Sequence, residues 1–174
     1  MNKKFSVLIL AQVAVLLAME VVLSRFFSIA TPITKFSFAF VPLAVCGALF
    51  GPVWGGVMGA LADLLGAILF PIGPYFPGYT LNNALRGVAL GMALKEGRRK
   101  WWQLALALVF NHVVIGIFLA ALWGHMLTDN PYWAVVGARV VQAAVMAPVQ
   151  FIIIRLMQRP VERYADLSHR RGVA

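Results

Sequence analysis

Long apolar segments that are almost free of charge constrain this chain more than any other feature of its sequence. A helix that spans a bilayer needs about 20 predominantly apolar residues, and the chain contains several such segments between short polar or proline-containing stretches. Charged residues make up 12% of the sequence, against roughly 25% in soluble domains. The sequence therefore predicts an all-α integral membrane protein that spans the lipid bilayer.

Proline, glycine and charge divide the chain into six predicted helices. Breaks are expected at RFFSIATPITKF, Gly51-Pro52, FPIGPYFPG, KEGRRK and TDNP, because proline removes a backbone donor and glycine permits tight turns. The predicted helices cover residues 5–25, 37–50, 53–70, 80–94, 101–127 and 132–158. They are expected to form a compact bundle of six transmembrane helices in one domain, residues 1–174, with a polar cytoplasmic tail over about residues 159–174.

Lysine and arginine are distributed unevenly between the two ends of these helices. With six spans, the N-terminus, the KEGRRK loop and the arginine-rich C-terminus all lie on one side, and only Arg25 and Lys35 lie on the other. Cytoplasmic loops of membrane proteins are enriched in basic residues. Both termini are therefore predicted to be cytoplasmic, with the loops that contain Pro32, Pro74 and Asp129 outside. The net charge of +9 reflects this topology, so no nucleic-acid partner is expected.

Several polar residues lie inside the predicted spans at similar depths. A charge near the bilayer centre costs at least ~2.5–3.5 kcal/mol, so such residues are kept for partners, pathways or ligands. At a rise of 1.5 Å per residue, five of them converge in the outer half of the membrane: Glu20, Asp63, Arg86, Arg139 and Gln142. The inner half offers few polar groups, which disfavours a stand-alone secondary transporter. The pattern predicts a pocket that opens to the outside and is closed below.

Charge pairing is the alternative explanation for these residues. Glu20 or Asp63 could pair with Arg86 or Arg139 and neutralise the buried charge without a ligand. The sequence leaves this alternative open for Glu20 and Arg139. For Asp63 and Arg86 a ligand-binding role is favoured, because both lie near the irregular outer loops.

The fourth predicted helix carries a polar stripe. Tyr79, Asn82, Asn83 and Arg86 follow the spacing i, i+3, i+4, i+7, which places them on one helix face. Small residues four apart occur elsewhere, and they are typical of close helix packing: Gly55/Gly59, Gly87/Gly91 and Ala14/Ala18. The polar stripe is predicted to line the pocket, and the glycines are predicted to be structural.

Other candidates for the pocket are aromatic or amide side chains near the outer loops. Asn111 and His112 are adjacent and point about 100° apart on a helix, so at most one should face the pocket, and Asn111 is favoured. Aromatic rings would suit a flat heterocyclic ligand, although anchoring at the membrane interface is the alternative; the candidates are Phe36, Phe38, Tyr75, Phe76 and Tyr79. No metal site is expected, because no second histidine or carboxylate lies at ligand spacing from His112.

Catalytic signatures are absent from the sequence. It contains no HExxH, no GxSxG and no P-loop with GK[ST], which are the motifs of zinc hydrolases, serine hydrolases and nucleotide hydrolases. The chain is therefore expected not to be an enzyme, and in particular not to hydrolyse ATP.

A longer stretch carries a family resemblance. FGPVWGGVMGALADLLGAILFPIGPYFPGYTL, the alanine pair Ala14/Ala18 and the basic loop before the fifth helix resemble the substrate-binding S components of energy-coupling factor (ECF) transporters, and within them the folate group. The motif match runs from about Phe36 to Leu94, and the general helix pattern covers almost the whole chain. The resemblance implies a multi-pass protein of the bacterial cytoplasmic membrane.

The resemblance also implies a mechanism and partners. The chain would capture a vitamin from outside and associate through Ala14 and Ala18 with a transmembrane coupling subunit that carries two cytoplasmic ATPases. ATP hydrolysis by these partners would drive the S component to topple and release the vitamin inward. No cofactor is expected; the bound ligand implied is folate.

Folate chemistry agrees with the candidate residues. A flat pterin would meet aromatic walls and the polar side chains of Asp63, Asn82 and Asn83, and the two carboxylates of the glutamate moiety would need cations, of which Arg25, Lys35 and Arg86 are available. Two alternatives stay open. One is an S component for another vitamin, such as pantothenate, pyridoxine or a thiamine precursor, and the other is a non-transporting membrane scaffold.

Overall fold

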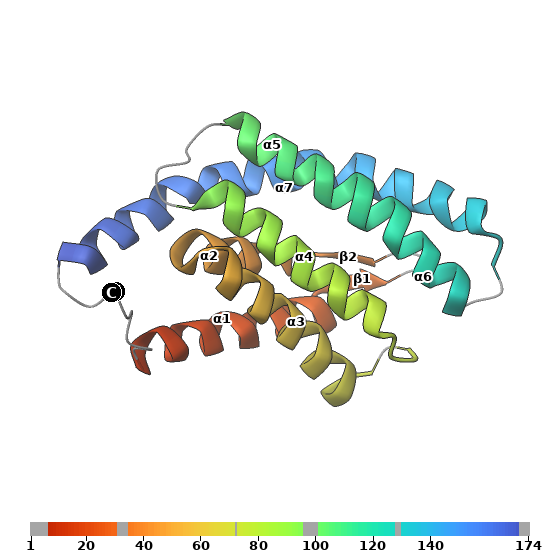
Figure 1. Ribbon diagram of the computed structural model, residues 1–174, viewed down its shortest axis with the longest axis horizontal. Coiled ribbons are helices and arrows are strands. Elements are labelled where there is room, and N and C mark those ends of the chain that lie inside the picture. The colour runs from red at the N-terminus through yellow and green to blue at the C-terminus, as the bar shows by residue number, and fades with distance from the viewer. Residues whose placement is uncertain (1–6, 31–34, 72, 96–100, 128–129, 171–174) are drawn as a thin grey trace.

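Six helical segments build the protein, in agreement with the prediction. The computed structural model describes residues 7–30, 35–71, 73–95, 101–127 and 130–170 (Figure 1). The helices are α1 (Val7–Arg25), α2 (Phe40–Phe50), α3 (Pro52–Leu69), α4 (Pro77–Leu94), α5 (Trp101–Phe110), the π-helical η1 (Asn111–Leu119), α6 (Ala120–Leu127) and α7 (Tyr132–Arg170). Because α5, η1 and α6 follow one another without a break, they count as one helix.

Four of the described helices are long and apolar enough to cross a membrane. They are α1, α3, the continuous helix Trp101–Leu127 and the part of α7 from Tyr132 to Val161. Helix α2 is shorter, with 11 residues, and α4 carries the polar stripe that lowers its hydropathy. Both of these helices are packed among the others near the centre of the bundle (Figure 1).

The segment between α1 and α2 differs from the prediction. It forms a short antiparallel hairpin of β1 (Ser28–Ala30) and β2 (Lys35–Ser37), with Ile29 opposite Phe36, and α2 begins at Phe40 rather than at residue 37. The alternation of Phe36, Phe38 and Phe40 explains the difference, because a period of two is the spacing of a strand and not of a helix.

Two other helix boundaries also differ from the prediction. Helix α4 begins at Pro77 instead of residue 80, since proline is well suited to the first turn of a helix, where its missing N–H leaves no bond unmade. Helix α7 continues to Arg170 instead of ending near residue 158, and it passes through Pro148 and Pro160. The polar C-terminal segment is thus helical as far as the structure describes it.

Glycines bring α3 and α4 into backbone contact, as the sequence predicted. A Cβ atom on Gly55 would lie 2.6 Å from the carbonyl oxygen of Gly87, and one on Gly59 would lie 2.5 Å from that of Asn83. Gly91 meets Pro52 at the start of α3 in the same way. A side chain at any of these positions would force the two helices apart, so the glycines set the distance between α3 and α4.

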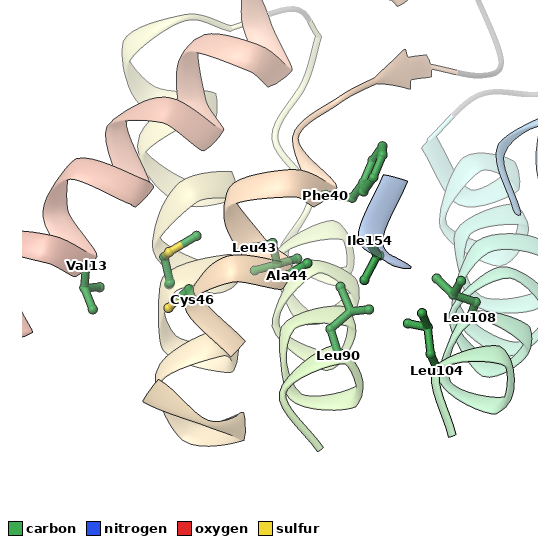
Figure 2. Close-up of a cluster of buried hydrophobic side chains, with 10 residues drawn as sticks. Val13, Phe40, Leu43, Ala44, Cys46, Leu90, Leu104, Leu108 and Ile154 are labelled. Atoms are coloured by element: carbon green, nitrogen blue, oxygen red, sulfur yellow. The ribbon is translucent and has the colours of Figure 1, made fainter. Parts of the chain in front are cut away.

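The hydrophobic core closes the bundle on one side of the polar residues. It joins α2, α4, α5 and α7 through buried side chains that include Leu43, Leu90, Leu104, Leu108 and Ile154 (Figure 2). Leu43 and Leu90 also line the cavity described below. The core therefore forms an apolar floor beneath that cavity.

Candidate functional site

A cavity of about 410 Å³ lies among α1, α2, α3, α4, η1 and α7. This volume falls within the ~300–1,000 Å³ typical of small-molecule sites. The structure brings nine of the predicted site residues together around it: Arg25, Asp63, Tyr75, Phe76, Tyr79, Asn82, Asn83, Arg86 and Asn111. The polar stripe of α4 therefore faces the cavity as expected.

The five polar residues predicted to converge do meet in this cavity. Glu20, Asp63, Arg86, Arg139 and Gln142 all line it, although they come from four helices that are distant in the sequence. Matching depth in separate helices was the only sequence signal for this arrangement.

Glu20 and Asn83 form a buried hydrogen-bonded unit between α1, α3 and α4. The Asn83 Nδ2 amide donates to Glu20 Oε1 at 2.9 Å and to the carbonyl oxygen of Gly59 at 2.8 Å. Glu20 is only 2% exposed, and its second oxygen, Oε2, has no hydrogen-bond partner among the described residues. Because a buried polar atom without a partner is costly, this oxygen is suited to accept a hydrogen bond from a ligand.

Asp63 is linked to the loop between α3 and α4. The Thr80 hydroxyl donates to Asp63 Oδ2 at 2.7 Å, and the Tyr75 hydroxyl lies 3.1 Å from the Thr80 hydroxyl. Tyr75 is about half exposed. These contacts connect the loop before α4 to a carboxylate in the cavity wall, so they hold the loop in place against the wall.

Three arginines supply the positive charge of the cavity. The Arg25 guanidinium lies against Gly66, where a Cβ atom would come within 2.6 Å of Arg25 Nε. Arg86 and Arg139 line the same cavity from α4 and α7. Buried charges are costly unless they are paired, so an anionic ligand would stabilise them. The site thus combines arginine donors with the carboxylates of Glu20 and Asp63.

The prediction that only one of Asn111 and His112 faces the cavity was wrong, because both line it. They begin the π-helical segment η1. A π-helix closes its hydrogen bonds from i to i+5 rather than i+4, so consecutive residues are rotated less than in an α-helix. Two neighbours can then share a wall, and π segments often occur at functional sites.

Two predicted residues, Phe36 and Phe38, are not part of the cavity wall that the described residues form. Phe36 and Phe38 belong to the hairpin and the turn after it, and Phe38 is half exposed. Phe40 lines the cavity instead, with its ring centroid 6.2 Å from that of Phe38. The side chain of Lys35 lies outside the described residues.

Several lining residues were not predicted as site residues. Ser24, Ser37, His112 and Gln150 all belong to the wall. A signal existed in α7, where Arg139, Gln142, Met146 and Gln150 repeat at intervals of three to four residues and so share one face. Ser24 and Ser37 had no comparable pattern.

The proposed partner surface and the absence of a metal site can be compared with the structure. Ala14 and Ala18 are both exposed on α1. Among the described residues, no group of three histidine, cysteine or acidic side chains is placed to hold a metal ion.

Comparison with known proteins identifies the family. Residues 9–157 match the family model "ECF transporter, substrate-specific component". The chain is 34% identical over 161 residues to the folate transporter FolT of Clostridium novyi, covering 92% of each chain. It is 29% identical over 143 residues to FolT of Leuconostoc mesenteroides, covering 79% of this chain and 77% of the relative.

A solved structure agrees with this assignment. The fold superposes with a TM-score of 0.82 on a crystal structure of FolT bound with folic acid, at 34% identity, covering 87% of this chain and 94% of the other. The prediction of a six-helix membrane protein that binds substrate and is not an enzyme is therefore confirmed. The chain belongs to the substrate-specific S components of ECF transporters.

Proposed function

We propose that this chain binds folate from outside the cell and delivers it inward as the S component of an ECF importer. The observation that carries the proposal is the cavity itself, which joins three arginines, two carboxylates and aromatic side chains above an apolar floor. The names of the two FolT relatives and the folic acid in the similar structure support the choice of vitamin.

The chemistry of folate fits this set of groups. Its glutamate moiety carries two carboxylates, which arginine can bind through paired charge-assisted hydrogen bonds. Arg25, Arg86 and Arg139 outnumber Glu20 and Asp63, so the lining has a positive excess. The pterin offers N–H donors for the carboxylate side and a flat surface for aromatic rings.

The remaining features of the proposal concern orientation and partners. Both termini would be cytoplasmic, in accord with the distribution of lysine and arginine, and the membrane would be the bacterial cytoplasmic membrane. The exposed pair Ala14/Ala18 would contact the transmembrane coupling subunit, and two ATPases bound to that subunit would supply the energy.

Ligand identification provides the direct test. The protein is purified in detergent, co-purifying small molecules are identified by mass spectrometry, and folic acid is titrated by calorimetry. Pantothenate, pyridoxine and thiamine are titrated in parallel. Saturable binding of folic acid alone is expected; tight binding of another vitamin without folic acid would replace the proposed substrate, and binding of none would favour the scaffold alternative.

A further inference from the structure

We infer that Trp123 is a positioning residue that fixes the orientation of Asn82, so that the Asn82 amide group presents a hydrogen-bond donor to the ligand. The inference rests on the proposed function and adds one requirement to it. The ligand must place a hydrogen-bond acceptor against Asn82, which restricts that part of the ligand to a carbonyl oxygen, an unprotonated ring nitrogen or a carboxylate oxygen.

The contact between the two side chains determines how the amide is turned. Trp123 lies in α6 and donates from Nε1 to Asn82 Oδ1 at 3.2 Å. An indole N–H is a donor only, so it must face the oxygen of the carboxamide rather than its nitrogen. The amide nitrogen of Asn82 is therefore turned away from Trp123.

The amide nitrogen of Asn82 has no hydrogen-bond partner in the part of the chain that the structure describes. Asn82 lines the cavity but is only 3% exposed, and its Nδ2 atom is buried without a hydrogen-bond partner among the described residues. A buried donor left unsatisfied costs the free energy of its desolvation. An acceptor on a bound ligand would recover that free energy.

The neighbouring asparagine shows that the arrangement is specific to Asn82. The amide nitrogen of Asn83 already donates to Glu20 and to the carbonyl oxygen of Gly59. Two adjacent asparagines on one helix face thus have different roles: Asn83 holds a carboxylate in place, and Asn82 keeps a donor unused.

Packing prevents the Trp123 indole from moving away. Its ring centroid lies 5.4 Å from that of Phe76, and a Cβ atom on Gly78 would come within 2.6 Å of Trp123 Cδ2. Gly78 is buried in the first turn of α4. The indole is therefore enclosed by the loop before α4 and by the first turn of that helix, while it does not itself line the cavity.

A double-mutant cycle tests the inference through folic acid affinity measured by calorimetry. Trp123→Phe keeps an aromatic ring for packing but removes the N–H group, and Asn82→Ala removes the donor itself. Each single change should weaken binding roughly two- to tenfold, the range expected for one hydrogen bond. In the Asn82→Ala background, Trp123→Phe should have no further effect, because the group that it orients is gone.

A matched control and a folding measurement separate positioning from general structure. Trp133→Phe changes an exposed tryptophan of α7 and should leave affinity unchanged, and thermal unfolding in detergent should show that all variants are folded. Equal losses from Trp123→Phe in both backgrounds would assign Trp123 a packing role and overturn the inference, as would no loss in either. Failure of the wild-type protein to bind folic acid would instead overturn the proposed function and, with it, this inference.

Discussion

The two carboxylates of the cavity have uncharged side chains as hydrogen-bond partners. Among the described residues, both carboxylates accept hydrogen bonds from neutral donors, Glu20 from Asn83 and Asp63 from Thr80. Arg86 is consequently in a position to serve an anionic ligand. The polar stripe that contains Arg86 could be predicted from the sequence because the helical period places its members on one face. The Trp123–Asn82 contact could not, since it joins two residues that are 41 positions apart in the sequence and belong to different helices.

Replacing Arg86 tests the ligand role at the residue scale. Arg86→Ala should reduce folic acid affinity on the order of tenfold or more, because hydrogen bonds to charged groups contribute about 1.5–3 kcal/mol. The fold should survive, since Arg86 lines a cavity and its removal takes away a charge that is costly to bury. Affinity is measured by calorimetry and folding by thermal unfolding in detergent. Arg159→Ala, on the exposed end of α7, is the matched control; an unchanged affinity for Arg86→Ala would remove this arginine from the site.

Secondary-structure elements position the site through three features that differ in how readily a sequence reveals them. Glycines four apart in the sequence predict the close α3–α4 contact, because small residues at this spacing are typical of tight helix packing. The π-helical segment Asn111–Leu119 gives no such pattern, since its residues are as apolar as those of an α-helix. The hairpin before α2 was not predicted: Phe36, Phe38 and Phe40 alternate with the period of a strand, but a loop was expected here, followed by a helix from residue 37.

The α3–α4 contact predicts a large effect from a small substitution. Gly55→Ala places a methyl group 2.6 Å from the carbonyl oxygen of Gly87, and such overpacking typically costs about 1–3 kcal/mol. The expected result is a lower thermal unfolding midpoint in detergent. Gly137→Ala is the control, because a Cβ atom there meets nothing within 4 Å; it should leave the midpoint unchanged or raise it, since alanine favours helix more than glycine does. Equal midpoints for the two variants would contradict the packing role of Gly55.

The molecule as a whole has a polar cavity on one side of an apolar core, which is the asymmetry required of a protein that captures a ligand from one side of a membrane. The core residues Leu43 and Leu90 line the cavity floor, so apolar side chains close the cavity on that side. Under the proposed function, release on the other side would require the whole domain to move, and the proposed partner surface on α1 would be the place where that movement is driven.

Orientation in the membrane can be tested with single cysteines in intact cells. Gly73 lies exposed in the loop before α4, and Lys95 lies exposed at the end of that helix. Under the proposed topology, Gly73→Cys should react with a membrane-impermeant thiol reagent, whereas Lys95→Cys should react only after the cells are opened. The native Cys46 is fully buried, so it should give little background. The reverse labelling pattern would place the cavity on the cytoplasmic side.

The partner surface yields a prediction that separates assembly from binding. Ala14 and Ala18 are exposed on one face of α1, and small residues at this spacing allow another helix to approach closely. Replacing both with tryptophan should prevent co-purification with the coupling subunit and abolish folate uptake, while the folic acid affinity of the isolated protein stays unchanged, because neither alanine lines the cavity.

A second alanine-to-tryptophan substitution, at an exposed position on another helix, controls for the effect of side-chain size. Ala144 is also exposed, on α7, and Ala144→Trp should affect neither assembly nor binding if α1 is the docking surface. Loss of ligand binding together with assembly in the Ala14/Ala18 variant would mean that α1 supports the cavity rather than a partner. Intact assembly in that variant would move the docking surface to another helix. Because the cavity and the alanine pair lie on different parts of α1, with Glu20 buried and Ala18 exposed, one helix can serve both functions, and the two measurements can be made independently.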